Sequence, residues 1–240
     1  MLNLIYSTPA PADFMRSNVA QLRELLREKF PGVRMAAERS EDKAVAVWPT
    51  GLPQIDKTLR GGLPKGGITE LICSVRASGG ALMLAALLRR AAEAGQFAVL
   101  IDGQDSFDPA SLSNEVLQQV LWVRCRDADQ ALKAADFVLR DANLPFVVVD
   151  LALNPPAQLR KIPATTWYRF QRIVEATATT VLVITPQKLV SGADVRLVLP
   201  NQFGLESLAR LEHELLPQLR FEVEDLRGGQ RPEALASEAG

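Results

Sequence analysis

The chain has 240 residues and a formal net charge of −1, with 48% hydrophobic and 23% charged side chains. These values are ordinary for a folded globular protein, and they exclude a disordered chain and one that binds nucleic acid through its overall charge. The single histidine, His213, argues against a histidine-rich metal centre or a Ser-His hydrolase. The two cysteines, Cys73 and Cys125, lie in apolar stretches and are expected to be reduced thiols in a core.

Residues 13–30 form the first predicted helix. Large apolar side chains recur along one helical face, Asp13 is a suitable N-cap, and a Pro-Gly pair follows the helix. The apolar stripe consists of Met15, Val19, Leu22 and Leu26. We expect residues 1–43 to be a helical arm and linker that mediates association with another protein. Packing of the stripe on the protein's own core would also remove it from water.

Residues 44–227 alternate apolar runs with amphipathic stretches. The predicted strands cover 44–48, 68–73, 97–102, 121–125, 146–150, 181–185, 195–199 and 219–224, and a turn-rich segment covers 49–67. The predicted helices cover 78–94, 127–142 and 164–177, and a shorter one opens at Asp108-Pro109. Continuous apolar strands that alternate with helices predict an α/β core with a mainly parallel central sheet flanked by helices. Residues 228–240 are rich in Gly, Glu, Ala and Ser and are predicted to be a disordered tail.

The loop after the strand 68–73 stands where a phosphate-binding P-loop would lie. A working P-loop needs a Lys for the β and γ phosphates and a Ser or Thr hydroxyl for Mg²⁺. Residues 74–81 read Ser-Val-Arg-Ala-Ser-Gly-Gly-Ala, and no Gly-Lys pair occurs anywhere in the chain. Arg76 and the free N–H groups of the following helix could still hold a phosphate. A loop that only joins strand to helix is the better interpretation.

Several motifs in order resemble the core of RecA-like recombinases. Residues 48–56 (Trp-Pro-Thr-Gly-Leu-Pro-Gln-Ile-Asp) and 61–71 (Gly-Gly-Leu-Pro-Lys-Gly-Gly-Ile-Thr-Glu-Leu) resemble the entry segment of that core. Residues 101–109 resemble its next strand and loop, 147–150 its Walker B strand, and 183–187 the strand that ends in a nucleotide-facing Gln. The resemblance covers about residues 44–190 and implies a RecA-like fold.

The departures from this family concern its nucleotide chemistry. The Walker A Lys and Thr fall on Gly79 and Gly80, the catalytic glutamate on Gln104, and the aromatic residue that stacks on adenine on Ser111. An amide cannot accept a proton from an attacking water. The resemblance therefore implies a vestigial nucleotide site, with no hydrolysis, no cofactor, and ATP binding that is weak or absent. Its residues are Arg76, Gly79, Gly80, Asp108, Asp150 and Gln187.

A RecA-like domain of this length without the P-loop Lys resembles the ImuA family, especially over residues 62–71. This resemblance implies a non-catalytic accessory role in DNA-damage-induced translesion synthesis and mutagenesis. The implied partners are an ImuB-type inactive homologue of Y-family polymerases, an error-prone replicative-type polymerase, and RecA. Self-association is a further expectation. The alternatives are a DNA-dependent ATPase of the RecA type and a SulA-like cell-division inhibitor. We expect a soluble cytoplasmic protein, or one associated with the nucleoid, because the longest apolar run, 81–88, is too short to span a membrane.

RecA-like proteins hold single-stranded DNA with a loop after the Walker B strand, which corresponds here to residues 154–163. Four cations lie in or just after it: Arg160, Lys161, Arg169 and Arg172. They are predicted to form a local phosphate-binding patch. Trp167 and Tyr168 could add stacking faces, but Trp167, Phe170, Ile173 and Val174 also have the spacing of a core-facing helix. The second DNA loop, 188–194, is short and carries one Lys, which predicts a poor DNA clamp.

Overall fold

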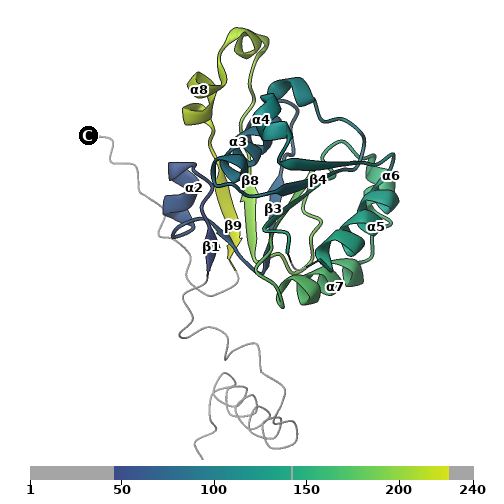
Figure 1. Ribbon diagram of the computed structural model, residues 1–240. Helices are drawn as coiled ribbons and strands as arrows, with labels where there is room; N and C mark the ends of the chain where they lie inside the picture. The colour runs from purple at the N-terminus through teal and green to yellow at the C-terminus, as the bar shows by residue number, and fades with distance from the viewer. Residues whose placement is uncertain (1–45, 142, 227–240) are drawn as a thin grey trace, which may run out of the picture. The chain divides into compact units, whose positions relative to one another are not determined.

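A computed structural model describes residues 46–141 and 143–226 of the chain, and the predicted arm and tail lie outside these residues. In the described part, seven strands form one sheet in the order β5-β4-β6-β7-β3-β8-β9 (Figure 1). The strands are β3 (Gly67–Ile72), β4 (Ala98–Asp102), β5 (Val120–Arg124), β6 (Phe146–Asp150), β7 (Thr180–Thr185), β8 (Val195–Val198) and β9 (Glu222–Leu226).

Every strand pair of this sheet is parallel except the last. Strand β3 pairs with β7 on one side and β8 on the other, and β4 pairs with β5 and β6. Strand β9 runs antiparallel to β8, with a register shift at Arg196 and Leu197. The predicted mainly parallel sheet is therefore confirmed.

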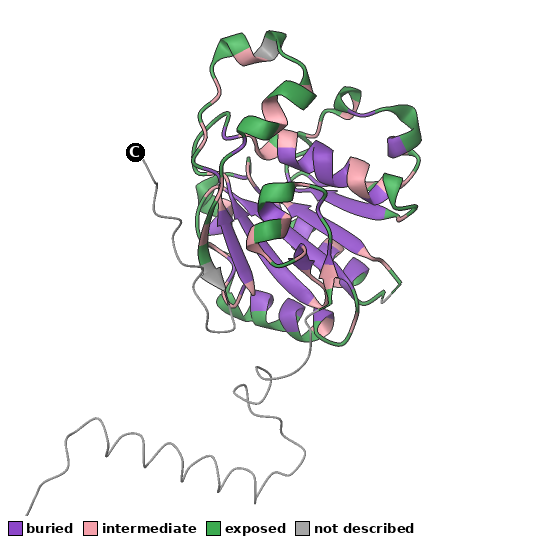
Figure 2. Ribbon diagram, turned by 90° about the vertical axis from the view of Figure 1, so that its left-hand side faces the viewer, coloured by how far each residue is buried: buried purple, intermediate pink, exposed green. Residues whose placement is uncertain are grey.

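Three long helices cover the two faces of the sheet. Helix α3 (Gly80–Glu93) contributes to one core cluster, and α5 (Ala128–Leu139) and α7 (Ala164–Val174) contribute to the other. Successive strand residues point to opposite faces, so that Phe146 and Val148 belong to the first cluster and Val147 and Val149 to the second. Figure 2 shows the buried sheet between its helices. Burial on both faces explains why the strands read as continuous apolar runs.

The ends of these helices follow from local chemistry. Helix α5 begins after Asp127, whose side chain accepts the N–H of Gln130 at 2.8 Å as an N-cap. Helix α3 begins after Gly79, which has φ +92°, and is followed by Gly95 with φ +65°. The predicted helix end at Gly95 is confirmed, because a residue without a Cβ adopts the left-handed conformation at low cost.

Smaller elements occupy segments whose sequence patterns are weak. Strands β1 (Val47–Trp48) and β2 (Leu63–Pro64) form an antiparallel pair. Short helices follow: α2 (Pro53–Thr58) within the predicted turn-rich segment, η2 (Pro109–Ser111), α4 (Asn114–Leu117), α6 (Pro156–Leu159), η3 (Leu205–Ala209), α8 (Glu212–Leu215) and η4 (Leu216–Gln218). Among the described residues, no helix is long and apolar enough to cross a membrane.

The last predicted strand, 219–224, begins too early. The short helix η4 ends at Gln218, and β9 starts at Glu222. Leu219 instead lies in the core cluster around α3, where it is 4% exposed. An apolar residue before a strand cannot be told from the strand's first residue by pattern alone.

Candidate functional site

The loops after β3, β4 and β6 leave the sheet at the same edge. Backbone hydrogen bonds join the strand ends there: Cys73 N–H donates to the carbonyl oxygen of Thr185 (2.8 Å), and Gly103 N–H donates to that of Asp150 (2.9 Å). Ligands of open α/β sheets bind beyond the carboxyl ends of parallel strands. The candidate site is therefore built from these loops.

The loop after β3, residues 73–80, turns the chain from the strand into α3. Two of its carbonyl oxygens accept hydrogen bonds from a distant part of the chain. The N–H of Phe203 donates to Ala77 at 3.0 Å, and Nδ2 of Asn201 donates to Ser78 at 3.1 Å. A segment between β8 and β9 therefore contacts the loop that stands at the position of a P-loop.

Side chains at Gly79 and Gly80 would meet neighbouring side chains at short distances. A Cβ built on Gly79 would lie 2.5 Å from Cδ1 of Leu219 and 3.0 Å from Cε2 of Phe203. A Cβ on Gly80 would lie 2.7 Å from Sγ of Cys73. The space around these two glycines is taken by apolar and thiol groups of the chain itself. A Lys at 79 or a Thr at 80 requires these neighbours to move.

Two titratable groups, Cys73 at the start of this loop and Asp150 at the end of β6, have raised pKa values. Burial raises the pKa of the Cys73 thiol to about 11, a hydrogen bond with Ser78 opposes the rise, and the charge of Asp150 adds to it. Burial also raises the pKa of Asp150 to about 6. The hydrogen bond from the N–H of Ala152 lowers this pKa, and the charge of Asp102 raises it further. Cys73 therefore remains a protonated thiol at neutral pH. Asp150 is held in an environment that favours its neutral form.

Asp102 organises the loop after β4. This carboxylate is 1% exposed and accepts the N–H groups of Ser106 and Phe107, each at 2.8 Å, and Nε1–H of Trp122 at 3.3 Å. The loop that carries Gln104 is thereby folded around a single buried carboxylate. Its hydrogen bonds are satisfied from within the chain.

Asn154 is a site residue that the sequence analysis missed. Its amide is 3% exposed, and Nδ2 donates to the carbonyl oxygen of Gly103 at 2.8 Å and to Oε1 of Gln158 at 3.1 Å. Nδ2 also lies 3.4 Å from Oε1 of Gln104. Asn154 thus links the loop after β6 to the position of the family's catalytic glutamate. A polar residue next to two prolines reads as an ordinary turn, so the sequence offers no signal for it.

The other predicted nucleotide residues are dispersed. Asp108 is exposed and accepts the N–H of Ala110 at 3.0 Å, so that it caps η2. The Oγ–H of Ser111 donates to the carbonyl oxygen of Asp108 at 2.7 Å. Arg76 and Gln187 are both exposed, in the loops after β3 and β7. In the described residues, no group of three or more His, Cys, Asp or Glu side chains is arranged to hold a metal ion.

The sequence matches the model of the RecA N-terminal domain over residues 21–162, which is more than half of the chain. This protein belongs to the RecA N-terminal domain family. It is 31% identical to Protein RecA of Leifsonia xyli subsp. xyli over 156 residues, covering 63% of this chain and 43% of that protein. It is 32% identical to Protein RecA of Clavibacter michiganensis subsp. michiganensis over 153 residues, covering 62% and 42%. The chain therefore spans less than half the length of these curated relatives.

A buried ion pair within the RecA-like core fixes the loop after β7. Glu70, in the middle of β3, is 0% exposed, and its Oε2 lies 2.6 Å from Nε of Arg196 on β8. Its Oε1 accepts the N–H groups of Leu189 (2.6 Å) and Val190 (3.0 Å). In the sequence, the only indication of this ion pair is one charged residue inside each of two apolar strands. The pairing of β3 with β8 brings Glu70 and Arg196 together.

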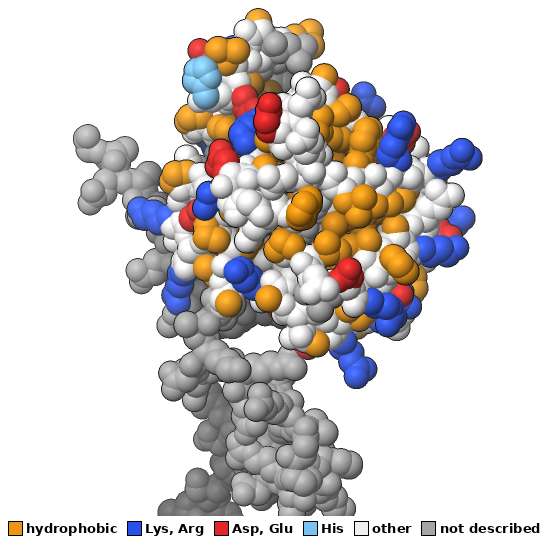
Figure 3. Space-filling view, viewed as in Figure 1, with side chains coloured by type: hydrophobic (Ala, Val, Ile, Leu, Met, Phe, Trp, Pro, Cys, Tyr) orange, Lys and Arg blue, Asp and Glu red, His pale blue; other side chains and the backbone are white. Residues whose placement is uncertain are grey.

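The four cations of the predicted DNA patch are all exposed: Arg160, Lys161, Arg169 and Arg172. Nε of Arg169 lies 3.0 Å from Oδ1 of Asp136 on α5. Figure 3 shows basic side chains along the rim of the molecule formed by α5, α6 and α7, with acidic ones among them. Part of the positive charge in this region is therefore balanced by neighbouring carboxylates.

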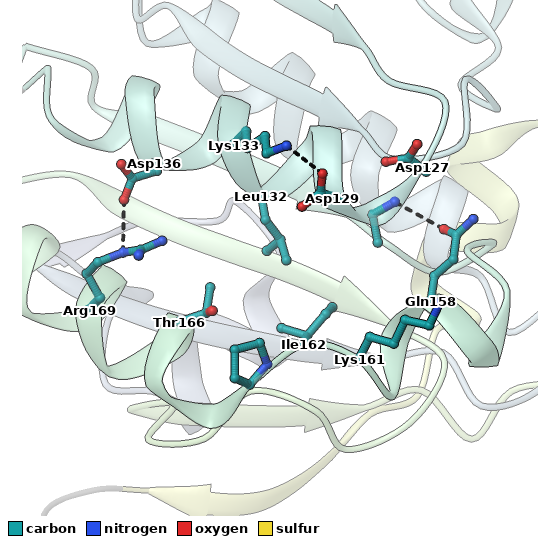
Figure 4. A pocket seen from close by; sticks show the side chains of 12 residues that line it. Asp127, Asp129, Leu132, Lys133, Asp136, Gln158, Lys161, Ile162, Thr166 and Arg169 are labelled. Carbon is teal, nitrogen blue, oxygen red and sulfur yellow. Dashed lines mark hydrogen bonds and ion pairs between the residues drawn. The ribbon is translucent and has the colours of Figure 1, made fainter.

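Between α5 and the segment α6–α7 lies an open groove of about 650 Å³ (Figure 4). The α5 wall carries Asp127, Asp129, Lys133 and Asp136, and the opposite wall carries Lys161 and Arg169. Lys133 and Asp129 pair along α5 at 2.7 Å. Because the α5 wall carries more carboxylates than cations, a polyanion would find a net positive charge on the α6–α7 side of the groove.

The aromatic residues of α7 divide between core and surface. Trp167 and Phe170 are each 1% exposed and belong to the core cluster, as the helical spacing predicts. Tyr168 is 49% exposed. Of the two stacking faces considered for this helix, only Tyr168 is accessible to a base.

Proposed function

We propose that this protein is a non-catalytic RecA-like accessory factor of DNA-damage-induced translesion synthesis and mutagenesis. It binds other proteins, and single-stranded DNA is a further ligand. Membership of the RecA N-terminal domain family supports a role in DNA repair. The ImuA-like segment 62–71, followed by a loop without Lys, supports the narrower role.

The packing around Gly79 carries the proposal. In a P-loop, the residue here must send an ammonium group to the phosphates. The side-chain direction at Gly79 is instead filled by Leu219 and Phe203, and the neighbouring Gly80 abuts Cys73. Gln104, at the position of the catalytic glutamate, supplies no base. The groups needed for hydrolysis are absent at two separate positions, the P-loop and the position of the catalytic glutamate. Both absences support the proposal that this protein does not hydrolyse ATP.

The proposed partners are an ImuB-type inactive polymerase homologue, an error-prone replicative-type polymerase and RecA, in the cytoplasm or at the nucleoid. The stripe Met15, Val19, Leu22 and Leu26 is the proposed contact for a partner or for a second copy of the chain. Four large apolar side chains on one face of the predicted helix favour burial against another surface. The cations of α6–α7 are the proposed contact for DNA phosphates.

Phosphate release from MgATP tests the proposed loss of catalysis. The full-length protein is assayed with and without single-stranded DNA, beside an active RecA as positive control. We expect a rate equal to that of a buffer blank in both conditions. Calorimetric titration with ATP, run on the same preparation, measures binding separately from turnover.

The alternative is a DNA-dependent ATPase in which the exposed Arg76 replaces the P-loop Lys. That alternative requires DNA-stimulated turnover that disappears in Arg76→Ala. Arg140→Ala is the matched control, because Arg140 is an exposed arginine at the end of α5. Turnover lost only in Arg76→Ala would replace the accessory role with the ATPase.

A further inference from the structure

The connection between β8 and β9 crosses the loop after β3. We call residues 199–221 the strap; in Figure 1 the strap is the excursion that carries α8. Its first part contributes Asn201 and Phe203 to the loop, and its last part contributes Leu219. The strap therefore reaches the loop from both of its ends.

Hydrogen bonds lock the two ends of the strap together over the loop. Nδ2 of Asn201 donates to the carbonyl oxygens of Ser78 (3.1 Å) and Arg220 (2.8 Å), and its Oδ1 accepts the N–H of Arg220 at 2.8 Å. One side chain thus joins the loop, the start of the strap and its end. Such a clamp fixes the loop without any bound ligand.

Apolar side chains of the strap also pack against the loop at Gly79. Leu219 is 4% exposed, and Phe203 packs against the same core cluster. Both side chains lie where a Cβ of Gly79 would project. Farther along α3, Arg89 forms a bidentate ion pair with Glu212 of the strap, with Nη2–Oε2 at 2.7 Å.

We propose that the strap is a built-in occupant of the former phosphate site, which holds the loop 73–80 in a fixed conformation and excludes a nucleotide while it is docked. Gly79 is part of this device, since a side chain at this position would meet Leu219 and Phe203 of the strap. The inference rests on the proposed loss of nucleotide chemistry. Its test measures hydrogen exchange in the loop and the strap, and therefore does not depend on an ATPase measurement.

Hydrogen exchange followed by mass spectrometry measures the docking in the full-length protein. Asn201→Ala removes the clamp at a partly exposed position, and Leu219→Ala removes the buried contact on Gly79. Leu205→Ala is the matched control, because Leu205 belongs to the strap and is 84% exposed. Peptides over 74–82 report on the loop, and a peptide over the central strand β6 reports on the fold.

We expect the loop peptide to exchange about tenfold faster in Asn201→Ala and Leu219→Ala, with β6 unchanged and Leu205→Ala like the wild type. Unchanged loop exchange in Asn201→Ala, or equal acceleration of loop and β6 in that variant, would overturn the proposal. Should Leu219→Ala unfold, Asn201→Ala decides alone.

A second pair of variants tests the same contact by changing the loop instead of the strap. Gly79→Lys places a long side chain against Leu219 and Phe203, whereas Gly95, which also has a positive φ, has no neighbour within 4 Å of its Cβ position. We expect strap peptides to exchange faster in Gly79→Lys than in Gly95→Lys. Equal exchange in the two variants would contradict the inference.

Addition of MgATP to the wild type separates the two proposals. Unchanged strap exchange is expected. Faster strap exchange with ATP would refute the proposed lack of nucleotide binding while supporting competition between strap and nucleotide. Slower loop exchange with an undisturbed strap would overturn the strap as an occupant of that site.

Discussion

The loops after β3 and β4 leave the same edge of the sheet but are held by different forces. The loop 73–80 is held from outside by the strap, through Leu219, Phe203 and Asn201. The loop after β4 is held from inside by Asp102, which accepts N–H groups of that loop. The first depends on apolar packing and hydrogen bonds from a distant segment, and the second on hydrogen bonds to a residue at its own base.

The difference shows two ways in which a loop at the carboxyl edge of the sheet is held without a ligand. A loop whose hydrogen bonds are satisfied internally keeps its shape without the ligand, as the Asp102 loop does. A P-loop keeps its N–H groups free for phosphate, so its loss leaves a space to be filled. Here Leu219 lies against Gly79 and Cys73 against Gly80, at the positions where the resemblance places the Walker A Lys and Thr.

Removing the carboxylate at the base of the second loop should have the largest effect on stability. Asp102→Ala leaves the N–H groups of Ser106 and Phe107 and the indole of Trp122 without their acceptor. We expect a loss of about 4 kcal/mol in the free energy of unfolding, measured by urea titration. Asp108→Ala is the control and should cost about 1 kcal/mol, because this exposed carboxylate caps only η2. Equal losses in the two variants would show that the loop does not depend on Asp102.

Asp150, the last residue of β6, gives a prediction about the pH dependence of stability. The pKa of Asp150 is raised from 3.8 to about 6 by burial, so the folded state holds a proton that the unfolded chain has released between these values. The resulting stabilisation is complete below pH 4 and is lost as pH rises through 6. Asp150→Asn, which stays neutral, should therefore be more stable than the wild type by about 2 kcal/mol at pH 7.5.

Urea titrations of both proteins at several pH values measure this difference. The advantage of Asp150→Asn should shrink as pH falls from 7.5 to 4.5, because the wild-type carboxyl then becomes neutral in the folded state. An advantage that is constant with pH would show that the substitution acts by another route than this titration.

The smallest expected effect concerns the glycine under the strap. Gly79→Ala adds a methyl group 2.5 Å from Leu219, whereas Gly95→Ala meets no atom within 4 Å. Gly95 has φ +65°, within the left-handed region, and Gly79 has φ +92°, beyond it, so backbone strain of about 1 kcal/mol applies to Gly95→Ala and at least as much to Gly79→Ala. We expect Gly79→Ala to cost about 1–2 kcal/mol more than Gly95→Ala in thermal or urea unfolding. Equal losses in the free energy of unfolding would show that the Leu219 side chain moves aside freely and that the strap is loosely packed on the loop.

Much of the fold was predictable because its signals are local. The strands β4, β6 and β7 are short apolar runs, and Asp127 and Gly95 mark helix ends through chemistry that needs only neighbouring residues. The short helices α2, α4 and α6 were missed, since four to six residues hold too little periodicity to be recognised. The strand predicted from Leu219 began too early for a similar reason.

The candidate site divides in the same way. The sequence by itself determined the missing functional groups, because the absence of a Lys after a glycine and the amide at Gln104 need no coordinates. Only the tertiary structure decided what replaced them. Asn201 and Ser78 lie 123 positions apart, and Glu70 and Arg196 lie 126 apart. Contacts over such distances arise when the parallel sheet places β8 beside β3, and no local pattern in the chain encodes them.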